Sequence, residues 1–169
     1  MLRPQPLRAA RDNVIDVTRW LDEEEMRAWR AFAEVNGHLI AALEADLAPH
    51  GLSLGDYEVL VQLSEAEHRQ LRMCDLADRL GLSPSGLTRR LDGLVRSAHV
   101  ERRPSSADRR VMLATLTDHG LAAMREAAND HVASVRRHLI DRLDAAHIRA
   151  LGEIFTSVAD GLGRNVAIA

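Results

Sequence analysis

The side chains best suited to chemistry in this chain are arginines, and many lie in one short window. Seven arginines and three acidic residues fall between Arg89 and Arg110, so this window carries a charge of +4, whereas the whole chain carries −3. A local basic stretch on an acidic protein is typical of a nucleic-acid-binding surface. On charge alone, a solvated face with an arbitrary sign bias explains it equally well.

The window opens with the stretch SPSGLTRRLDGL, which runs from Ser83 to Leu94. Serine is a good N-cap and proline favours the first helical position, so the stretch predicts a helix that begins after Ser83. Three leucines, at positions 87, 91 and 94, would bury one face of this helix. The open side would then present Ser85, Gly86, Thr88, Arg89 and Arg90.

Small residues and arginines at the start of a helix suit contact with DNA. The free N–H groups of a helix N-terminus attract phosphate, and a guanidinium can donate two hydrogen bonds to guanine O6 and N7. We therefore predict DNA contacts from Ser83 through Arg90. For Arg89, an internal ion pair with Asp92 is an equally good interpretation. For Arg90, DNA contact is favoured.

Further arginines flank a predicted two-stranded hairpin, in which runs 99–103 and 109–116 enclose the turn-rich sequence PSSAD. Arg109 and Arg110 would begin the second strand and, with a period of two, point to opposite faces. One of them could then reach a narrow minor groove. Arg102 and Arg103 are expected to contact phosphates. Charged residues also protect hairpin edges from pairing, but the combined pattern favours DNA.

The rest of the chain predicts a mainly α-helical protein around this small β-hairpin. Hydrophobic residues make up 46% and aromatic residues 3% of the chain, so the core must be aliphatic. Helices are predicted at 22–48, 54–63, 71–81, 83–96, 118–138 and 145–162, with caps at Asp22, Ser53, Ser83, Thr117 and Asp144. Short helices followed by a hairpin form the order of a winged helix-turn-helix, here with long helices at both ends.

The first helix carries an apolar stripe that is wider than one neighbouring element would cover. Residues spaced by three and four form the stripe, namely Met26, Trp29, Ala33, Asn36, Ile40, Leu43 and Leu47. Phe32, Val35 and Leu39 widen it. We therefore expect this helix to pack against a second copy of the chain as well as against its own domain.

From Leu76 to Gly120 the chain resembles the MarR family of bacterial transcription regulators. LADRLGLSPSGLTRRLDGLVRSAHVERR is similar to the family's helix-turn-helix, and ADRRVMLATLTDHG is similar to its wing strand and the start of the next helix. Ser105-Ser106 departs from the Asp-Pro of many members. The resemblance implies a homodimer that binds a pseudo-palindromic double-stranded DNA operator, as a repressor. It also implies that Arg110, oriented by Asp108, enters the minor groove.

Together with the element order, the resemblance implies a division of the chain into four parts. These are an N-terminal arm (1–21), a dimerisation helix (22–48), the winged helix-turn-helix DNA-binding domain (49–117) and C-terminal dimerisation helices (118–169). A small, perhaps aromatic, effector would bind between the dimerisation helices and the DNA-binding domain. Candidate ligand residues mix apolar walls with polar groups: Trp29, His38, Tyr57 and Arg72. Singly, Trp29 and Tyr57 are better explained as core or interface residues.

The sequence carries no motif typical of an enzyme, a metal site or a membrane-spanning segment. No catalytic serine elbow, Gly-rich phosphate loop or recognisable carboxylate pair is present, so we predict neither an enzyme nor a cofactor. His131 and His138 lie seven residues apart without a second ligand pair, which favours surface histidines over a metal site. No apolar run approaches the roughly 20 residues that span a bilayer, so no membrane association is expected, and a cytoplasmic location is the default.

Two alternatives to a ligand-responsive regulator stay open. The lone cysteine, Cys74, is expected to be buried or inert, but it could make the protein a thiol-based redox-sensing regulator. The winged domain could instead be a protein-interaction module, whose basic face binds an acidic partner rather than specific DNA.

Overall fold

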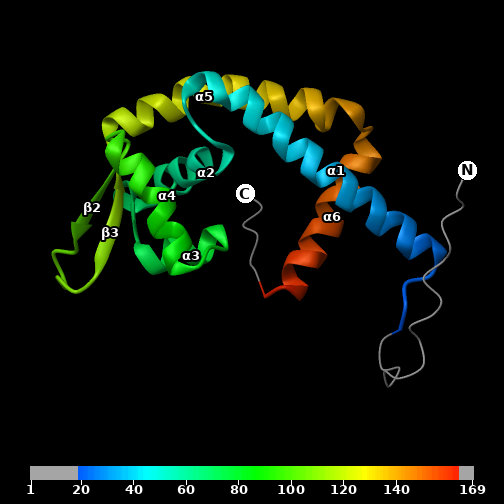
Figure 1. Ribbon diagram of the computed structural model, residues 1–169, viewed down its shortest axis with the longest axis horizontal. Coiled ribbons are helices and arrows are strands. Elements are labelled where there is room, and N and C mark those ends of the chain that lie inside the picture. The colour runs from blue at the N-terminus through cyan, green and yellow to red at the C-terminus, as the bar shows by residue number, and fades with distance from the viewer. Residues whose placement is uncertain (1–18, 164–169) are drawn as a thin grey trace, which may run out of the picture. The chain divides into compact units, whose positions relative to one another are not determined.

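The computed structural model describes residues 19–163 and divides into two compact units, residues 1–36 and 37–169. The helices are α1 (Glu23–Leu47), α2 (Leu54–Ser64), α3 (Met73–Leu80), α4 (Pro84–Arg96), α5 (Asp118–His138) and α6 (Ala145–Gly161), and the strands are β1 (Gln70–Arg72), β2 (Val100–Pro104) and β3 (Met112–Leu116) (Figure 1). Short 3-10 turns lie at Ala48–His50, Glu67–Arg69 and Ile140–Arg142. The predicted N-terminal arm falls mostly outside the described residues.

The helices begin where the sequence places caps. Ser53, Ser83 and Thr117 each accept a hydrogen bond at the side-chain oxygen from the backbone N–H three residues on, and Asp144 does the same for His147. Asp22 and Glu25 form a reciprocal capping box at the start of α1. Such caps satisfy backbone donors that have no partner within the helix. These predicted helix starts are confirmed.

The sheet has three strands rather than the two that the sequence predicts. Its order is β1-β3-β2, all antiparallel, with Leu71 opposite Ala114 and Arg102 opposite Ala114 on the other side. The predicted third helix, 71–81, includes residues 71 and 72, which belong to β1 instead, so that part of the prediction is wrong. His68 and Arg69 take positive φ angles of 54°, which turn the chain onto β3 before α3 begins at Met73.

The core of the unit that begins at residue 37 is aliphatic, as predicted. Its fully buried side chains come from the helices α1 to α5 and from β2 and β3, and the larger ones include Leu47, Leu60, Leu63, Leu76, Leu87, Leu91 and Val100. The core therefore fixes α4 from its leucine face. Truncating a leucine such as Leu60 to alanine would cost about 2–5 kcal/mol of stability.

A polar cluster joins the end of α1 to α5. Asp46 Oδ2 accepts hydrogen bonds from Ser134 Oγ at 2.6 Å and Arg137 Nη2 at 2.5 Å, and it lies 3.0 Å from His138 Nε2. The Ser134 hydroxyl, followed by the Arg137 guanidinium, lowers the pKa of Asp46 to about 2. His138 is therefore half-buried at this joint rather than a free surface histidine.

Apolar side chains remain exposed on helices in both units. On α1 they include Trp29, Phe32 and Val35, with Trp20 and Leu21 just before this helix, and on α6 they include Ile148, Ile154, Phe155 and Val158, with Leu162 just after it. Leu43 and Leu47, further along α1, are buried. Within residues 19–163, no helix combines the length and the apolar character needed to span a membrane.

Candidate nucleic-acid interface

Helix α4 presents its N-terminal turn at the surface, and we call it the reading helix. Ser83 Oγ accepts a hydrogen bond from Gly86 N at 3.1 Å, and Thr88 Oγ1 donates to Pro84 O at 2.9 Å. A Cβ at Gly86 would lie 3.1 Å from Ser83 Oγ, so the glycine keeps this cap open. Ser83, Ser85, Thr88 and Arg89 are exposed, whereas Gly86 is half-buried.

Arg89 and its expected internal partner do not pair. The Asp92 carboxylate binds Arg102 Nη2 at 2.8 Å instead, and among residues 19–163 Arg89 has no hydrogen-bond or ion-pair partner. The guanidinium of Arg89 is thus free to bind an external group. The sequence could not decide between an Arg89–Asp92 ion pair and DNA contact by Arg89, because the residue that binds Asp92 instead, Arg102, comes from the hairpin.

Arg90 lies on a different side of the reading helix from the one expected. Its Nη1 is 3.5 Å from Ser53 Oγ and 3.9 Å from Asp56 Oδ1, at the start of α2. The side chain is only 33% exposed. Arg90 follows Leu87 by three residues and precedes Leu94 by four, so helical spacing aligns it with the buried leucines rather than with Arg89.

The wing consists of β2, β3 and the connecting residues 105–111, and Arg102 ties it to the reading helix. Arg102 Nη2 donates to Thr88 O at 2.8 Å and pairs with Asp92, while its Nε is buried and has no partner among the described residues. Arg103 pairs with Glu101 on the same strand and keeps 65% of its side chain exposed. Of this pair of arginines, Arg103 is the more accessible one.

At the tip of the wing, Asp108 holds Arg110. Its carboxylate accepts hydrogen bonds from Arg110 Nε and Nη2, each at 3.1 Å, and from Arg110 N at 3.0 Å. The Arg110 side chain is nevertheless 91% exposed. These hydrogen bonds lower the pKa of Asp108 below its ordinary value. The orientation of Arg110 by Asp108, which the resemblance implies, is therefore present.

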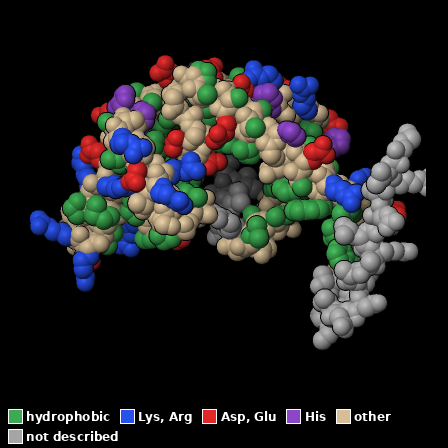
Figure 2. Space-filling model, viewed as in Figure 1, with side chains coloured by type: hydrophobic (Ala, Val, Ile, Leu, Met, Phe, Trp, Pro, Cys, Tyr) green, Lys and Arg blue, Asp and Glu red, His purple; other side chains and the backbone are tan. Residues whose placement is uncertain are grey.

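Arg109 and Arg110 do not belong to a strand, which corrects the expectation that they alternate across β3. That strand begins at Met112, and both arginines lie in a turn in which Val111 N donates to Asp108 O at 2.9 Å. Arg109 is exposed as well. Several arginine side chains lie over the strands and α4, on the left of Figure 2.

Of the four candidate ligand residues, Tyr57 lines a cavity, of about 520 Å³, between α1, α2, α3 and α5. Its ring lies 4.5 Å from that of His131, centroid to centroid. Burial raises the pKa of Tyr57 and lowers that of His131. His131 Nδ1 is buried without a partner among the described residues, and Glu58, Gln62 and Arg79 add polar groups to a lining that also holds aliphatic side chains. The sequence missed His131 as a lining residue.

The other three candidate ligand residues lie elsewhere. Arg72 is exposed at the end of β1, where its charge helps to lower the pKa of Asp108. His38 is exposed on α1 and does not line the Tyr57 cavity. Trp29 belongs to the other unit, where it is 56% exposed with its ring 6.0 Å from that of Phe32.

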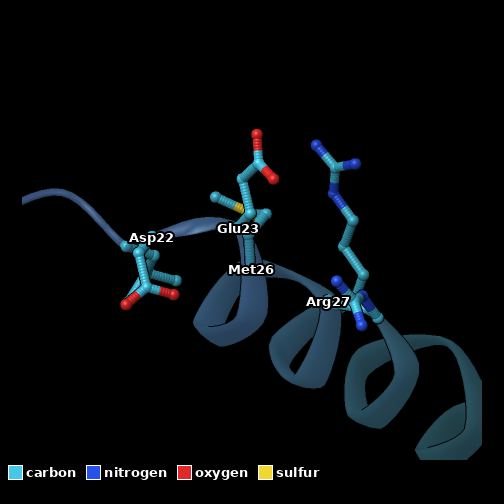
Figure 3. Close-up of a pocket in the computed structure, with 6 residues that line it drawn as sticks. Asp22, Glu23, Met26 and Arg27 are labelled. Carbon is cyan, nitrogen blue, oxygen red and sulfur yellow. The ribbon is translucent and has the colours of Figure 1, made fainter.

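A second hollow, of about 430 Å³, lies at the start of α1 (Figure 3). Its lining residues are Leu21, Asp22, Glu23, Met26, Arg27 and Arg30. Glu23 and Arg27, one turn apart, both point away from the helix in this view. A single helix start thus forms this hollow, and its charged groups do not converge.

Cys74 is exposed in the first turn of α3, so the thiol is not buried, and its inertness stays a prediction. Its Sγ lies 3.3 Å from Asp75 Oδ1. Within residues 19–163, no three histidine, cysteine or acidic residues are grouped so as to hold a metal ion. His131 and His138 serve two separate places, the cavity and the Asp46 cluster.

Comparisons with known proteins agree with this geometry. The MarR family model matches residues 50–111, from the end of the first 3-10 turn to the tip of the wing. The structure of AbsC, a MarR family transcriptional regulator from Streptomyces coelicolor, is similar with 44% sequence identity and a TM-score of 0.81, over 86% of this chain and 98% of that one.

Two further relatives are also transcription regulators. A MarR family transcriptional regulator from the same organism, solved in complex with DNA, is 35% identical with a TM-score of 0.81, over 85% of this chain and 94% of its own. The transcriptional repressor YetL of Bacillus subtilis is 25% identical over 138 residues, which cover 80% of this chain and 83% of the repressor.

Proposed function

The chain belongs to the MarR family, and on that premise we propose that it is a transcription regulator that binds specific double-stranded DNA as a homodimer. It acts as a repressor in the cytoplasm, without catalysis or a cofactor. The relatives named above are regulators or repressors, and one of them was solved with DNA.

One observation carries this proposal. Arginines at the start of the reading helix and on the wing, namely Arg89, Arg103, Arg109 and Arg110, are exposed, while Arg102 braces these two elements against each other. A reading helix suits the major groove, and an arginine at a wing tip suits a narrow minor groove. The proposed DNA-contacting residues are Ser83, Ser85, Gly86, Thr88, Arg89, Arg103, Arg109 and Arg110, with Asp108 orienting Arg110.

The exposed apolar residues of α1 and α6 support the homodimer. Side chains such as Trp29 and Phe155 lie on helices at the two ends of the chain, and large exposed apolar surfaces mark interaction sites. A two-fold axis would place two reading helices in major grooves about one helical turn apart, roughly 10 base pairs.

The cavity beside Tyr57 and His131 is the proposed site of an effector. Its volume of about 520 Å³ suits a small molecule, and its lining combines apolar side chains with polar ones, among them Tyr57, Glu58 and His131. We therefore place a small apolar or aromatic effector with a hydrogen-bonding group there, and expect its binding to release DNA.

The test begins with selection of a preferred duplex from a random-sequence pool by the purified protein. Fluorescence anisotropy then measures the affinity for that duplex, with an unrelated duplex of equal length as competitor. We expect a Kd in the range of roughly 10⁻⁸–10⁻¹¹ M that survives the competitor, and a log affinity that falls linearly with log salt. Equal competition by both duplexes would contradict a sequence-specific regulator and favour a protein-interaction module.

A further inference from the structure

Arg90 joins the reading helix to the first turn of α2. Its Nη1 lies 3.5 Å from Ser53 Oγ and 3.9 Å from Asp56 Oδ1. Both partners are already fixed, because Ser53 and Asp56 form the capping box of α2, with Ser53 Oγ donating to Asp56 Oδ2 at 2.6 Å. Arg90 therefore binds a rigid feature of the domain, and α2 and α4 lie side by side (Figure 1).

The contact depends on a glycine between these two partners. A Cβ at Gly55 would lie 2.0 Å from Arg90 Nη1 and 2.3 Å from its Cζ, so the guanidinium occupies the space that any other residue's side chain would fill. We call Ser53, Gly55 and Asp56 the cradle of Arg90.

The cradle provides a directional contact for the reading helix, which the leucine face does not provide. Leu87, Leu91 and Leu94 are buried against the core, but apolar burial has no direction and tolerates small rotations of a helix. A planar guanidinium has fixed donor directions, so its hydrogen bonds are weakened by a helix rotation that leucine packing would tolerate. Arg90 therefore fixes the rotation of α4 about its axis, and with it the direction in which Arg89 points.

We propose that Arg90 is a positioning residue for DNA recognition, which sets the reading helix through the Ser53–Gly55–Asp56 cradle and does not bind DNA itself. The inference rests on the proposed function of α4 as the element that reads DNA. It assigns the two adjacent arginines opposite roles: Arg89 faces the ligand and Arg90 faces the protein.

The decisive variant is Gly55→Ala, which displaces the guanidinium without changing any charge. We expect affinity for the selected duplex to fall about tenfold, comparable to the loss of one base contact. Affinity for an unrelated duplex and the slope of log affinity against log salt should stay unchanged. The Tm should be at or above that of the wild type, since alanine is the better helix former. A purely structural role of the contact would lower the Tm and leave the preference between duplexes intact.

Two further variants complete the test. Gly93→Ala, in α4, is the matched control, because a Cβ there meets nothing within 4 Å and Gly93 is not among the proposed DNA-contacting residues, so it should keep the wild-type preference. Arg90→Gln should reproduce the Gly55→Ala loss with an unchanged salt slope. The double variant should lose no more than either single variant, since both remove one contact.

Different outcomes would overturn the inference. If Gly55→Ala keeps the wild-type preference, the cradle does not set the reading helix. If Arg90→Gln reduces the salt slope by about one and weakens both duplexes alike, Arg90 is a phosphate contact. A wild-type protein that selects no duplex would contradict the proposed function together with this inference, whereas either of the first two results contradicts the inference alone.

Discussion

The basic window, Arg89 to Arg110, has arginines that face solvent and arginines that face the rest of the fold. The two sets have different roles. On the outward side, Arg89, Arg109 and Arg110 are exposed, and Arg110 pairs with its near neighbour Asp108. On the inward side, Arg90 and Arg102 are half-buried and bind groups on other elements. Charge alone does not separate these sets. What separates them is the position of each residue relative to the buried leucines and to carboxylates elsewhere in the fold.

The largest effect that follows from this difference concerns the outward side. Arg110→Ala should weaken binding to the selected duplex by more than tenfold, because a dimer would lose one wing contact on each side and each contact is worth about 1–3 kcal/mol. Fluorescence anisotropy measures this loss, and circular dichroism checks that the fold is kept. An unchanged affinity would remove the wing from the proposed interface.

On the inward side, Arg102→Met should reduce the free energy of unfolding by about 1–3 kcal/mol. The change removes hydrogen bonds to Asp92 and to Thr88 O, which include a charged pair, and leaves that carbonyl without its donor. Urea unfolding measures the effect, and a double-mutant cycle with Asp92→Asn isolates the ion pair. If Arg102→Met is as stable as the wild type, the brace between wing and reading helix does not matter for folding.

Arg89→Ala provides the matched contrast in stability. Its side chain has no partner among the described residues, so the free energy of unfolding should change by no more than about 0.5 kcal/mol while binding to the selected duplex weakens. The same urea and anisotropy measurements apply. A large loss of stability would show that Arg89 belongs with the inward set.

The smallest expected effect is a change in the pKa of Asp108. Arg110 lowers the pKa of Asp108, so its pairing stabilises the folded wing above the ordinary carboxyl pKa, and this contribution is lost as the pH falls through the lowered value. In Arg110→Ala the pKa of Asp108 should therefore rise towards that of an ordinary aspartate. Carboxyl ¹³C chemical shifts followed from pH 2 to 6 measure it. No change would mean that another group controls Asp108.

Features set by neighbouring residues could be predicted from the sequence, and those set by distant contacts could not. The caps at Ser53, Ser83 and Thr117 each depend on a backbone N–H three residues away, so local chemistry determines them. Strand β1 has three residues and exists through its pairing with β3, which leaves almost no local signal.

The arginines likewise divide into those whose contacts the local sequence predicts and those whose contacts depend on distant elements. The loss of the expected pair between Arg89 and Asp92 follows from Arg102, which comes from another element. For Arg90, however, a signal was available, because its spacing from Leu87 and Leu94 placed it beside the buried face. The cavity residue His131 was identifiable only once α5 had been placed against α2.

The first turn of α2 serves two places at once. Leu54, Tyr57 and Glu58 line the cavity, while the residues between and before them, Ser53, Gly55 and Asp56, hold Arg90. One helical turn is about 5.4 Å long, so these two sets of residues are neighbours on the same backbone segment. If an effector binds in the cavity as proposed, a displacement of this turn would move Ser53, Gly55 and Asp56 and, through the side chain of Arg90, the reading helix.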